Sequence, residues 1–306
     1  MLNAVLVGCG AMSKGWLEAL TEEPSLRERV AIVGLVDIDR SAAERRRAEF
    51  SLTGAQTGSD LKVMLTATKP DLLFDVAVPA TRRDVVLAGL RHGCHVLTEK
   101  PMAASMDEAR EIVAAAKVAG RVHAVVQNRR FIPGVRRIRR LIDTGALGEL
   151  TALHADFFIG AHFGGFREQM QNVLLLDMAI HTLDAARFMA NADPLAVYCT
   201  ETNPKDSWYA HGAAANAIFE MAEGILFTYR GSWVAEGSIT SWESRWRVIG
   251  TRGTLLWDGG DTFDAHVLNG DQGFLRPLAE LEVLPPPDDA HIHGHASVIT
   301  DFLDAI

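Results

Sequence analysis

The chain has few cysteines. Its 306 residues contain three, Cys9, Cys94 and Cys199, which lie far apart and lack the spacing of metal ligands. This pattern predicts reduced thiols rather than a disulfide framework, and with them a cytoplasmic protein.

Long apolar runs are also lacking. No stretch approaches the length of a membrane span. Met1 leads directly into a short apolar run without a charged leader. We therefore expect no signal peptide and no membrane partner.

The chain also lacks an excess of positive charge. The formal net charge of −9 argues against nucleic acid as the main partner. Basic runs do occur at Arg45-Arg46-Arg47 and at Arg136-Arg137 with Arg139-Arg140, but their helical spacing indicates solvated helix faces. Hydrophobic residues make up 48%, as in ordinary globular proteins, and the length is enough for two domains with sizeable cores.

One lysine stands where α/β proteins place functional groups. Cys94-His95-Val96-Leu97-Thr98 is typical of a buried parallel strand, and Pro101 should end it because proline cannot donate to a sheet ladder. Glu99 and Lys100 would then lie at the carboxyl end of the strand, where open sheets bind their ligands. Lys100 is a candidate catalytic or ligand-binding residue; the alternative is a solvated loop lysine.

The amino terminus has the pattern of strand, glycine turn and helix. Residues 2–7 are apolar, and Gly8-Cys9-Gly10-Ala11-Met12-Ser13 follows at once. Gly8 permits a tight turn, Gly10 lets a pyrophosphate approach the backbone, and the helix start supplies unpaired N–H groups and a positive dipole end. Ser13 stands at the third position of the dinucleotide fingerprint, where a small side chain still allows close packing.

A carboxylate closes the second expected strand. Asp37 follows the apolar residues 32–36 at about the distance beyond the glycines at which dinucleotide-binding folds place a ribose-binding acid. It would repel a 2′-phosphate, which favours NAD over NADP. Arg40 could hold a phosphate, so NADP is the alternative cofactor. Asp39 is better suited to cap the following helix.

A third segment, residues 173–189, has helical periodicity and contains Asp177-Met178-Ala179-Ile180-His181. Positions i and i+4 share a helix face, so Asp177 and His181 could line one cleft. A histidine can take a proton from an alcohol, and a carboxylate beside it favours its charged form. A surface pair or a buried structural histidine is the alternative.

The order of expected elements predicts two domains. In residues 1–127 strands alternate with helices, which predicts a doubly wound parallel (Rossmann) sheet. In residues 128–306 strands dominate, and only the helix containing Asp177 interrupts them, which predicts an α+β domain with a large, mostly antiparallel open sheet. The expected strands are 2–7, 31–36, 72–78, 94–98 and 122–126, then 149–159, 195–202, 213–220, 225–234, 245–249 and 253–258.

These features together resemble one family, the Gfo/Idh/MocA oxidoreductases, from Met1 nearly to Ile306. The motifs that carry the resemblance are Gly8-Cys9-Gly10-Ala11-Met12, Gly93 to Pro101, Asn128-Arg129-Arg130-Phe131, Asp177 with His181, and Gly250-Thr251 with Gly253. The resemblance implies an NAD(P)-binding domain, a second domain whose open sheet commonly forms dimers or tetramers, and a sugar, polyol or cyclitol substrate.

The resemblance also implies roles for single residues. Lys100 would contact the reacting hydroxyl and the nicotinamide ribose, His181 would be the general base, and Asp177 would orient it. The implied cofactor contacts, with Asp37, are Gly8, Cys9, Gly10, Ala11, Met12, Val78, Pro79, Glu99, Lys100, Asn128 and Arg167. Further residues that could reach the substrate are His154, Gln169, Asn172 and Trp233.

Some positions depart from the family pattern. Ala80 and Arg83 stand where many relatives have Asn and His, and the chain stops at Ile306 within an amphipathic pattern that relatives continue. His291-x-His293-x-His295 could bind zinc on a strand, but Gly294 breaks the strand pattern and hydride transfer in this family needs no metal. We expect no metal site, and a pocket-rim role for one of these histidines.

The sequence therefore predicts an NAD(P)-dependent dehydrogenase acting on CH–OH groups, assembled as a homodimer or homotetramer. Two alternatives remain open. One is a glycosidase-type enzyme that uses NAD without net redox change, and the other is a catalytically silent nucleotide sensor. The presence of Lys100, Asp177 and His181 together argues against the sensor.

Overall fold

The computed structural model describes residues 1–285 and 294–306, which form two compact units. The first unit contains residues 1–128 and also the last described segment, 294–306; the second contains residues from 129 onward up to 285. The expected division lay between residues 127 and 128; the observed division lies one residue later, and the last described segment also joins the first unit. His291 and His293 lie outside the described residues.

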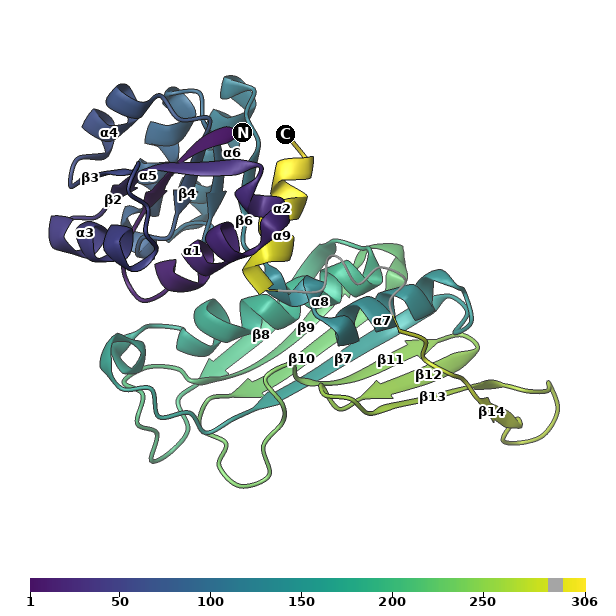
Figure 1. Ribbon diagram of the computed structural model, residues 1–306. Helices are drawn as coiled ribbons and strands as arrows, with labels where there is room; N and C mark the ends of the chain where they lie inside the picture. Colours follow the sequence, from purple (N-terminus) through teal and green to yellow (C-terminus); the bar gives the residue numbers. More distant parts are fainter. Residues whose placement is uncertain (286–293) are drawn as a thin grey trace. The chain divides into compact units, whose positions relative to one another are not determined.

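The first unit contains a six-stranded parallel sheet in the order β3-β2-β1-β4-β5-β6 (Figure 1). From β1 the chain first adds strands on one side of the sheet (β2, β3) and then on the other (β4, β5, β6), so the strand order reverses between β1 and β4. Open sheets bind ligands at such a point. The strands are β1 (Leu2–Val7), β2 (Val30–Val36), β3 (Gln56–Gly58), β4 (Leu72–Asp75), β5 (His95–Thr98) and β6 (His123–Val125).

Helices cover both faces of this sheet (Figure 1). They are α1 (Ser13–Glu22), α2 (Pro24–Arg27), α3 (Arg40–Glu49), α4 (Leu61–Thr68), α5 (Pro79–Arg91), α6 (Met106–Ala119) and α9 (Gly294–Asp304). The helix α9 joins the first unit because its apolar residues Val298, Ile299 and Phe302 are buried, and Arg29 pairs with Asp304 at 2.7 Å. No helix in the described ranges is long and apolar enough to cross a membrane.

The five strands expected in the first unit are present, with ends shifted by up to three residues. The strand expected at 72–78 stops at Asp75, because Pro79 already begins α5. The strand β3 was not predicted, since a three-residue strand with the sequence Gln-Thr-Gly has no apolar run to mark it. Asp39 caps α3 as expected, accepting a hydrogen bond from Ser41 N.

The second unit contains an eight-stranded sheet in the order β14-β13-β12-β11-β7-β10-β9-β8. Among its described strands, only β7 and β10 are parallel neighbours, so the expected mostly antiparallel sheet is confirmed. The strands are β7 (Leu150–Phe158), β8 (Pro194–Thr202), β9 (Ala214–Met221), β10 (Leu226–Ser232), β11 (Arg245–Gly250), β12 (Gly253–Trp257), β13 (Phe263–Leu268) and β14 (Leu278–Glu280).

One face of this sheet is covered by α7 (Pro133–Asp143) and α8 (Ile180–Ala190) (Figure 1). Short helical segments connect the other elements: η1 (Asn128–Phe131), η2 (Gly165–Gln169), the π-helix η3 (Leu174–Ala179) and η4 (Ala222–Gly224). The expectation of a single helix in this part was wrong, because α7 is a second one, and β13 and β14 were also missed.

Packing explains why α7 forms. Val135, Ile138 and Leu141 are buried along one side of the helix. Gly134 lets the helix approach β12 closely, since a Cβ there would lie 2.0 Å from the Trp257 ring. A larger residue at position 134 would push the helix off the sheet.

The arginines of α7 do not form a solvated face, so that expectation was wrong. Arg137 lies over the Phe263 ring and donates to Val283 O. Arg139 donates to Met189 O at 3.1 Å, near the end of α8. Arg136 lies over the rings of two phenylalanines. The guanidinium groups therefore tie α7 to its neighbours while their stems cover apolar surface.

Candidate active site

The glycine turn follows β1 at the carboxyl end of the parallel sheet. Gly8 has φ +92°, and a Cβ on it would lie 2.6 Å from Ala77 N in the loop after β4. Only glycine therefore lets these two loops touch at the point where the strand order reverses. Gly10 has open space around its Cβ position, and Ala11 and Met12 are exposed. The turn leaves room for a ligand above Gly10.

Ser13 strengthens this turn in a way that glycine could not. Its buried hydroxyl donates to Gly10 O at 2.6 Å and accepts from Arg46 Nε at 3.0 Å. Arg46 also donates to Gly10 O at 2.9 Å. The arginine run on α3 therefore includes one residue that holds the glycine turn, which its helical spacing did not reveal.

The start of α1 is open to an anion. Its N-cap residue is Met12, and no side chain in the described residues caps it. A helix start with unpaired N–H groups attracts phosphate.

Asp37 joins the second strand to the glycine turn. Its carboxylate accepts hydrogen bonds from Cys9 N at 2.7 Å and from Asp39 N at 2.9 Å. Each carboxylate oxygen retains lone pairs for a further donor, such as a ribose hydroxyl. Burial, and then the charge of Asp37, raise the pKa of the Cys9 thiol to about 12 against a smaller effect of Arg46. Cys9 is thus a neutral packing residue.

Lys100 follows β5 as expected, and its neighbour Glu99 is buried. The Glu99 carboxylate accepts from Trp16 Nε1 at 2.7 Å and lies 3.2 Å from His295 Nε2. Burial would raise the pKa of Glu99, but the hydrogen bonds from His295 and Trp16 outweigh it and hold that pKa below its usual range. The peptide bond between Lys100 and Pro101 is cis. The side chain of Glu99 therefore anchors the loop.

The remaining expected cofactor residues of the first unit lie at the same edge of the sheet. Val78 and Pro79 are exposed after β4, and Asn128 follows β6. Asn128 Oδ1 and Gln127 Oε1 are buried and make no hydrogen bond to the described residues, so each could accept one from a ligand. Arg83, which stands where many relatives have His, pairs with Glu111 of α6 on the surface.

In the second unit, Asp177 lies in the π-helix η3 and His181 in the first turn of α8. π-Helical turns are rare and often occur at functional sites. Because the turn is wider than in an α-helix, the spacing of four does not by itself place both residues on one face. The carboxylate of Asp177 accepts from Arg167 Nε at 2.8 Å.

Aromatic rings surround Arg167 and extend toward His181. The Arg167 guanidinium lies 5.0 Å from the ring centres of both Phe163 and Phe166. Trp242 packs against Phe163 and also lines a small cavity beside His181. The ion pair of Arg129 and Glu243 borders the same cavity. Trp242 and Glu243 were not predicted from the sequence, because nothing in their local pattern marks them. Arg129 belongs to a motif that carries the family resemblance, but no role was predicted for it.

The other expected substrate residues are scattered. Gln169 and Asn172 are exposed, and Trp233 is buried in the core. His154 lies on the sheet face opposite the one packed in the core, because its neighbours Leu153 and Ala155 point into the core. The expectation that His154 reaches the same site as His181 was therefore wrong.

Comparison with known protein families matches both units. Residues 2–127 match the model described as "Oxidoreductase family, NAD-binding Rossmann fold", and residues 135–256 match the "GFO/IDH/MocA C-terminal domain".

The chain belongs to the Gfo/Idh/MocA family.

Its relatives in that family are distant. It is 27% identical over 280 residues to an inositol 2-dehydrogenase 4 of Saccharopolyspora erythraea, covering 90% of this chain and 79% of the relative. It is 26% identical over 232 residues to a 1,5-anhydro-D-fructose reductase of Ensifer adhaerens, covering 72% and 67%. The matched part of some other curated relatives is as little as 31% of their length.

A similar solved structure is that of an oxidoreductase from Agrobacterium radiobacter in complex with NAD+, L-tartaric acid and magnesium. It superposes with a TM-score of 0.84 at 18% identity, covering 99% of this chain and 89% of that one. At this identity the likeness shows the shared fold.

The first unit of this Gfo/Idh/MocA protein fits the NAD of its family. Gly8 and Gly10 provide the close turn and the open space, the start of α1 provides N–H groups, and Asp37 provides acceptors at the end of β2. Lys100 belongs to this unit, whereas Asp177, His181 and Arg167 belong to the second. No group of three or more metal-ligating side chains occurs within the described ranges.

Proposed function

We propose that this chain is an NAD-dependent dehydrogenase acting on a CH–OH group of a sugar, polyol or cyclitol. The observation that carries the proposal is the position of Lys100 at the carboxyl end of β5, two strands from the glycine turn of β1 in the same sheet. The family supports an oxidoreductase, and relatives named for inositol and anhydrofructose support a polyhydroxylated substrate.

In this proposal, separate residues bind the cofactor and act on the substrate. The glycine turn and the start of α1 hold the pyrophosphate, and Asp37 accepts hydrogen bonds from the adenosine ribose, which favours NAD over NADP. NAD held by these residues would supply the hydride acceptor for the substrate carbon. His181 takes the proton from the substrate hydroxyl, and Lys100 Nζ donates to the same oxygen and stabilises its developing negative charge. Asp177 favours the imidazolium that results.

The test is a screen of the purified chain with NAD against sugars, polyols and cyclitols, following nicotinamide absorbance. With an active substrate in hand, Lys100→Met and His181→Ala should each retain NADH binding, because the pyrophosphate site lies on other residues. For His181→Ala we expect a loss of turnover of ~10²–10⁴-fold, the usual worth of a general base. Lys117→Met, on α6, is the control. Near-normal turnover in His181→Ala would contradict the base assignment and favour Lys100.

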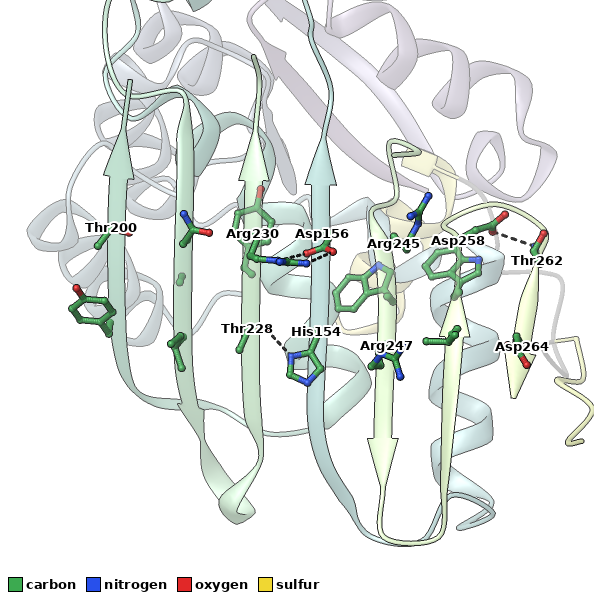
Figure 2. Close-up of a pocket in the computed structure, with 18 residues that line it drawn as sticks. His154, Asp156, Thr200, Thr228, Arg230, Arg245, Arg247, Asp258, Thr262 and Asp264 are labelled. Carbon is green, nitrogen blue, oxygen red and sulfur yellow. Dashed lines mark hydrogen bonds and ion pairs between the residues drawn. The ribbon is translucent and has the colours of Figure 1, made fainter. Parts of the chain in front are cut away.

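We also infer that the chain forms a homo-oligomer through the outer face of the eight-stranded sheet. Figure 2 shows the side chains on this face, which line a hollow of about 880 Å³. Arg230 pairs with Asp156 in a two-bond contact at 2.7 and 2.6 Å. Tyr198 and Ile218 are 69% and 47% exposed on neighbouring strands. A face with exposed apolar side chains beside a fixed charge pair is suited to a second protein surface.

A further inference from the structure

Arg82, on α5, is buried although arginine is among the residues least often found inside proteins. Only 1% of its surface is exposed. All three guanidinium nitrogens donate hydrogen bonds: Nε to Asp75 Oδ2 at 3.0 Å, Nη2 to Ala77 O at 2.7 Å and Nη1 to Pro101 O. One side chain therefore bonds a buried carboxylate and two backbone carbonyl oxygens.

Two of these acceptors lie in different loops, and the third lies at the end of a strand. Asp75 is the last residue of β4, and Ala77 directly precedes Val78 and Pro79 in the loop after it. Pro101 directly follows Lys100 in the loop after β5. A single guanidinium thus fixes the spacing between the loops that follow β4 and β5, two neighbouring strands of the parallel sheet.

The other side of Lys100 is fixed as well. Glu99 accepts hydrogen bonds from Trp16 on α1 and from Lys100 N, and it contacts His295 on α9. Both chain neighbours of Lys100 are therefore held by buried groups. What Arg82 adds is the hold on Pro101, which no partner of Glu99 provides.

Stability alone does not account for this pair. Asp75 and Arg82 form an ion pair that is almost fully removed from water, and apolar residues of similar size often stabilise a core equally well. An apolar pair could not bond two carbonyl oxygens in different loops. Lysine carries its three donors on a single nitrogen, so it lacks the planar fork that lets arginine bond separate acceptors in fixed directions.

We propose that Arg82 is a positioning residue that sets the location of Lys100 relative to the loop bearing Val78 and Pro79. The inference rests on the proposed function of Lys100 as the group that holds the reacting oxygen. Arg82 itself touches neither substrate nor cofactor in this account, and acts through the carbonyl oxygens of Ala77 and Pro101.

The test compares three variants. Arg82→Lys keeps a charge beside Asp75 but loses the fork. The double variant Asp75→Leu with Arg82→Met removes both buried charges together, which protects folding. Arg83→Met, the next residue on α5, removes a partly exposed arginine that pairs with Glu111 and serves as the matched control. Thermal unfolding and NADH affinity are measured first, to establish that each variant is folded.

Two readouts then decide. Hydrogen exchange of the peptides covering residues 76–82 and 97–104 should speed up in both Arg82 variants, while the β1 peptide and the Arg83→Met protein stay unchanged. In the activity assay kcat should fall on the order of 10²-fold with KM nearly constant, because a small misplacement of a catalytic group costs about that much. Unchanged exchange in the folded Arg82 variants would overturn the inference.

Failure of the proposed function gives a different result. If Lys100→Met retained full turnover, Lys100 would not hold the reacting oxygen, whatever the exchange data showed. If Lys100→Met were inactive but both Arg82 variants kept normal kcat and normal exchange, Lys100 would keep its role and only the positioning by Arg82 would be wrong.

Discussion

The indole N–H of Trp16 donates a 2.7 Å hydrogen bond to the buried carboxylate of Glu99, 83 residues further along the chain. Trp16→Phe keeps an aromatic ring but removes the donor. Hydrogen bonds to charged groups are worth about 1.5–3 kcal/mol, so we expect a loss of that order in the free energy of unfolding, measured in urea.

Trp246→Phe is the matched control for this change. Trp246 is equally buried, but its Nε1–H donates to the neutral carbonyl oxygen of Glu243. Loss of ring volume is the same in both variants, so Trp16→Phe should be the more costly of the two. Equal costs would mean that the charge of Glu99 contributes nothing.

Asp177→Asn tests the carboxylate that is proposed to favour the imidazolium form of His181. The variant should retain NADH binding and lose less turnover than His181→Ala. The acid limb of its rate profile should move to lower pH, because an imidazolium beside a neutral amide is less stable than one beside a carboxylate. The profile is measured with the substrate found in the screen. An unmoved profile would assign Asp177 to holding Arg167 alone.

Asp37 is expected to set the cofactor preference. The wild-type chain should bind NADH more tightly than NADPH in a fluorescence titration, since a carboxylate at the end of β2 repels the 2′-phosphate. Asp37→Ser should narrow the difference. Arg40→Ala is the companion variant, because it removes the guanidinium that could otherwise hold a 2′-phosphate. In the structure, Arg40 pairs with Glu44 on the surface of α3. Tighter NADPH binding by the wild type would refute the preference and direct attention to Arg40.

His123 on β6 should make stability depend on pH. Burial, and then the charge of Arg82, lower the pKa of His123 to about 4 from its ordinary 6.5. Between these values the unfolded chain binds more protons, so stability rises with pH and falls on acidification from 6.5 toward 4. His123→Gln should remove most of that pH dependence, a difference in the free energy of unfolding on the order of 3 kcal/mol between pH 6.5 and pH 4. The exposed His211→Gln is the control, and identical slopes in all three proteins would exclude the effect.

The outer sheet face gives a prediction about assembly. Light scattering at micromolar concentration should show a dimer or a larger homo-oligomer. The double variant Tyr198→Asp with Ile218→Asp should shift the chain toward the monomer. Val118→Asp, at a residue 90% exposed on α6, should leave the oligomer intact. A monomeric wild-type chain would rule out the interface.

Local pattern was enough to predict most of the first unit. Apolar runs marked the strands that carry Gly8 and Lys100, because buried parallel strands are apolar on both faces. Local pattern did not predict β3, which has no apolar run. It also gave the wrong environment for α7, whose four arginines were interpreted as a solvent-exposed face. Those arginines cover Phe188 and Phe263 and bond to carbonyl oxygens, contacts that depend on residues far away in the sequence.

The candidate site shows the same limit. The positions of Lys100, Asp37 and Gly8 could be predicted because these residues follow the ends of apolar strands. Arg82 could not, because a buried arginine looks like any other arginine until its three acceptors are known. His154 was placed wrongly because alternation along a strand tells which residues share a face, but not which face the helices cover.

The helix α9 has a consequence for how the protein is made. The first unit is not continuous in sequence, because it is built from residues 1–128 and 294–306. The contacts of Glu99 with His295 and of Arg29 with Asp304 can form only after residues 294–306 have been synthesised. A ribosome therefore translates the whole second unit before the first can be completed. A fragment cut at residue 128 would expose the surface of α1 and α2 that α9 covers.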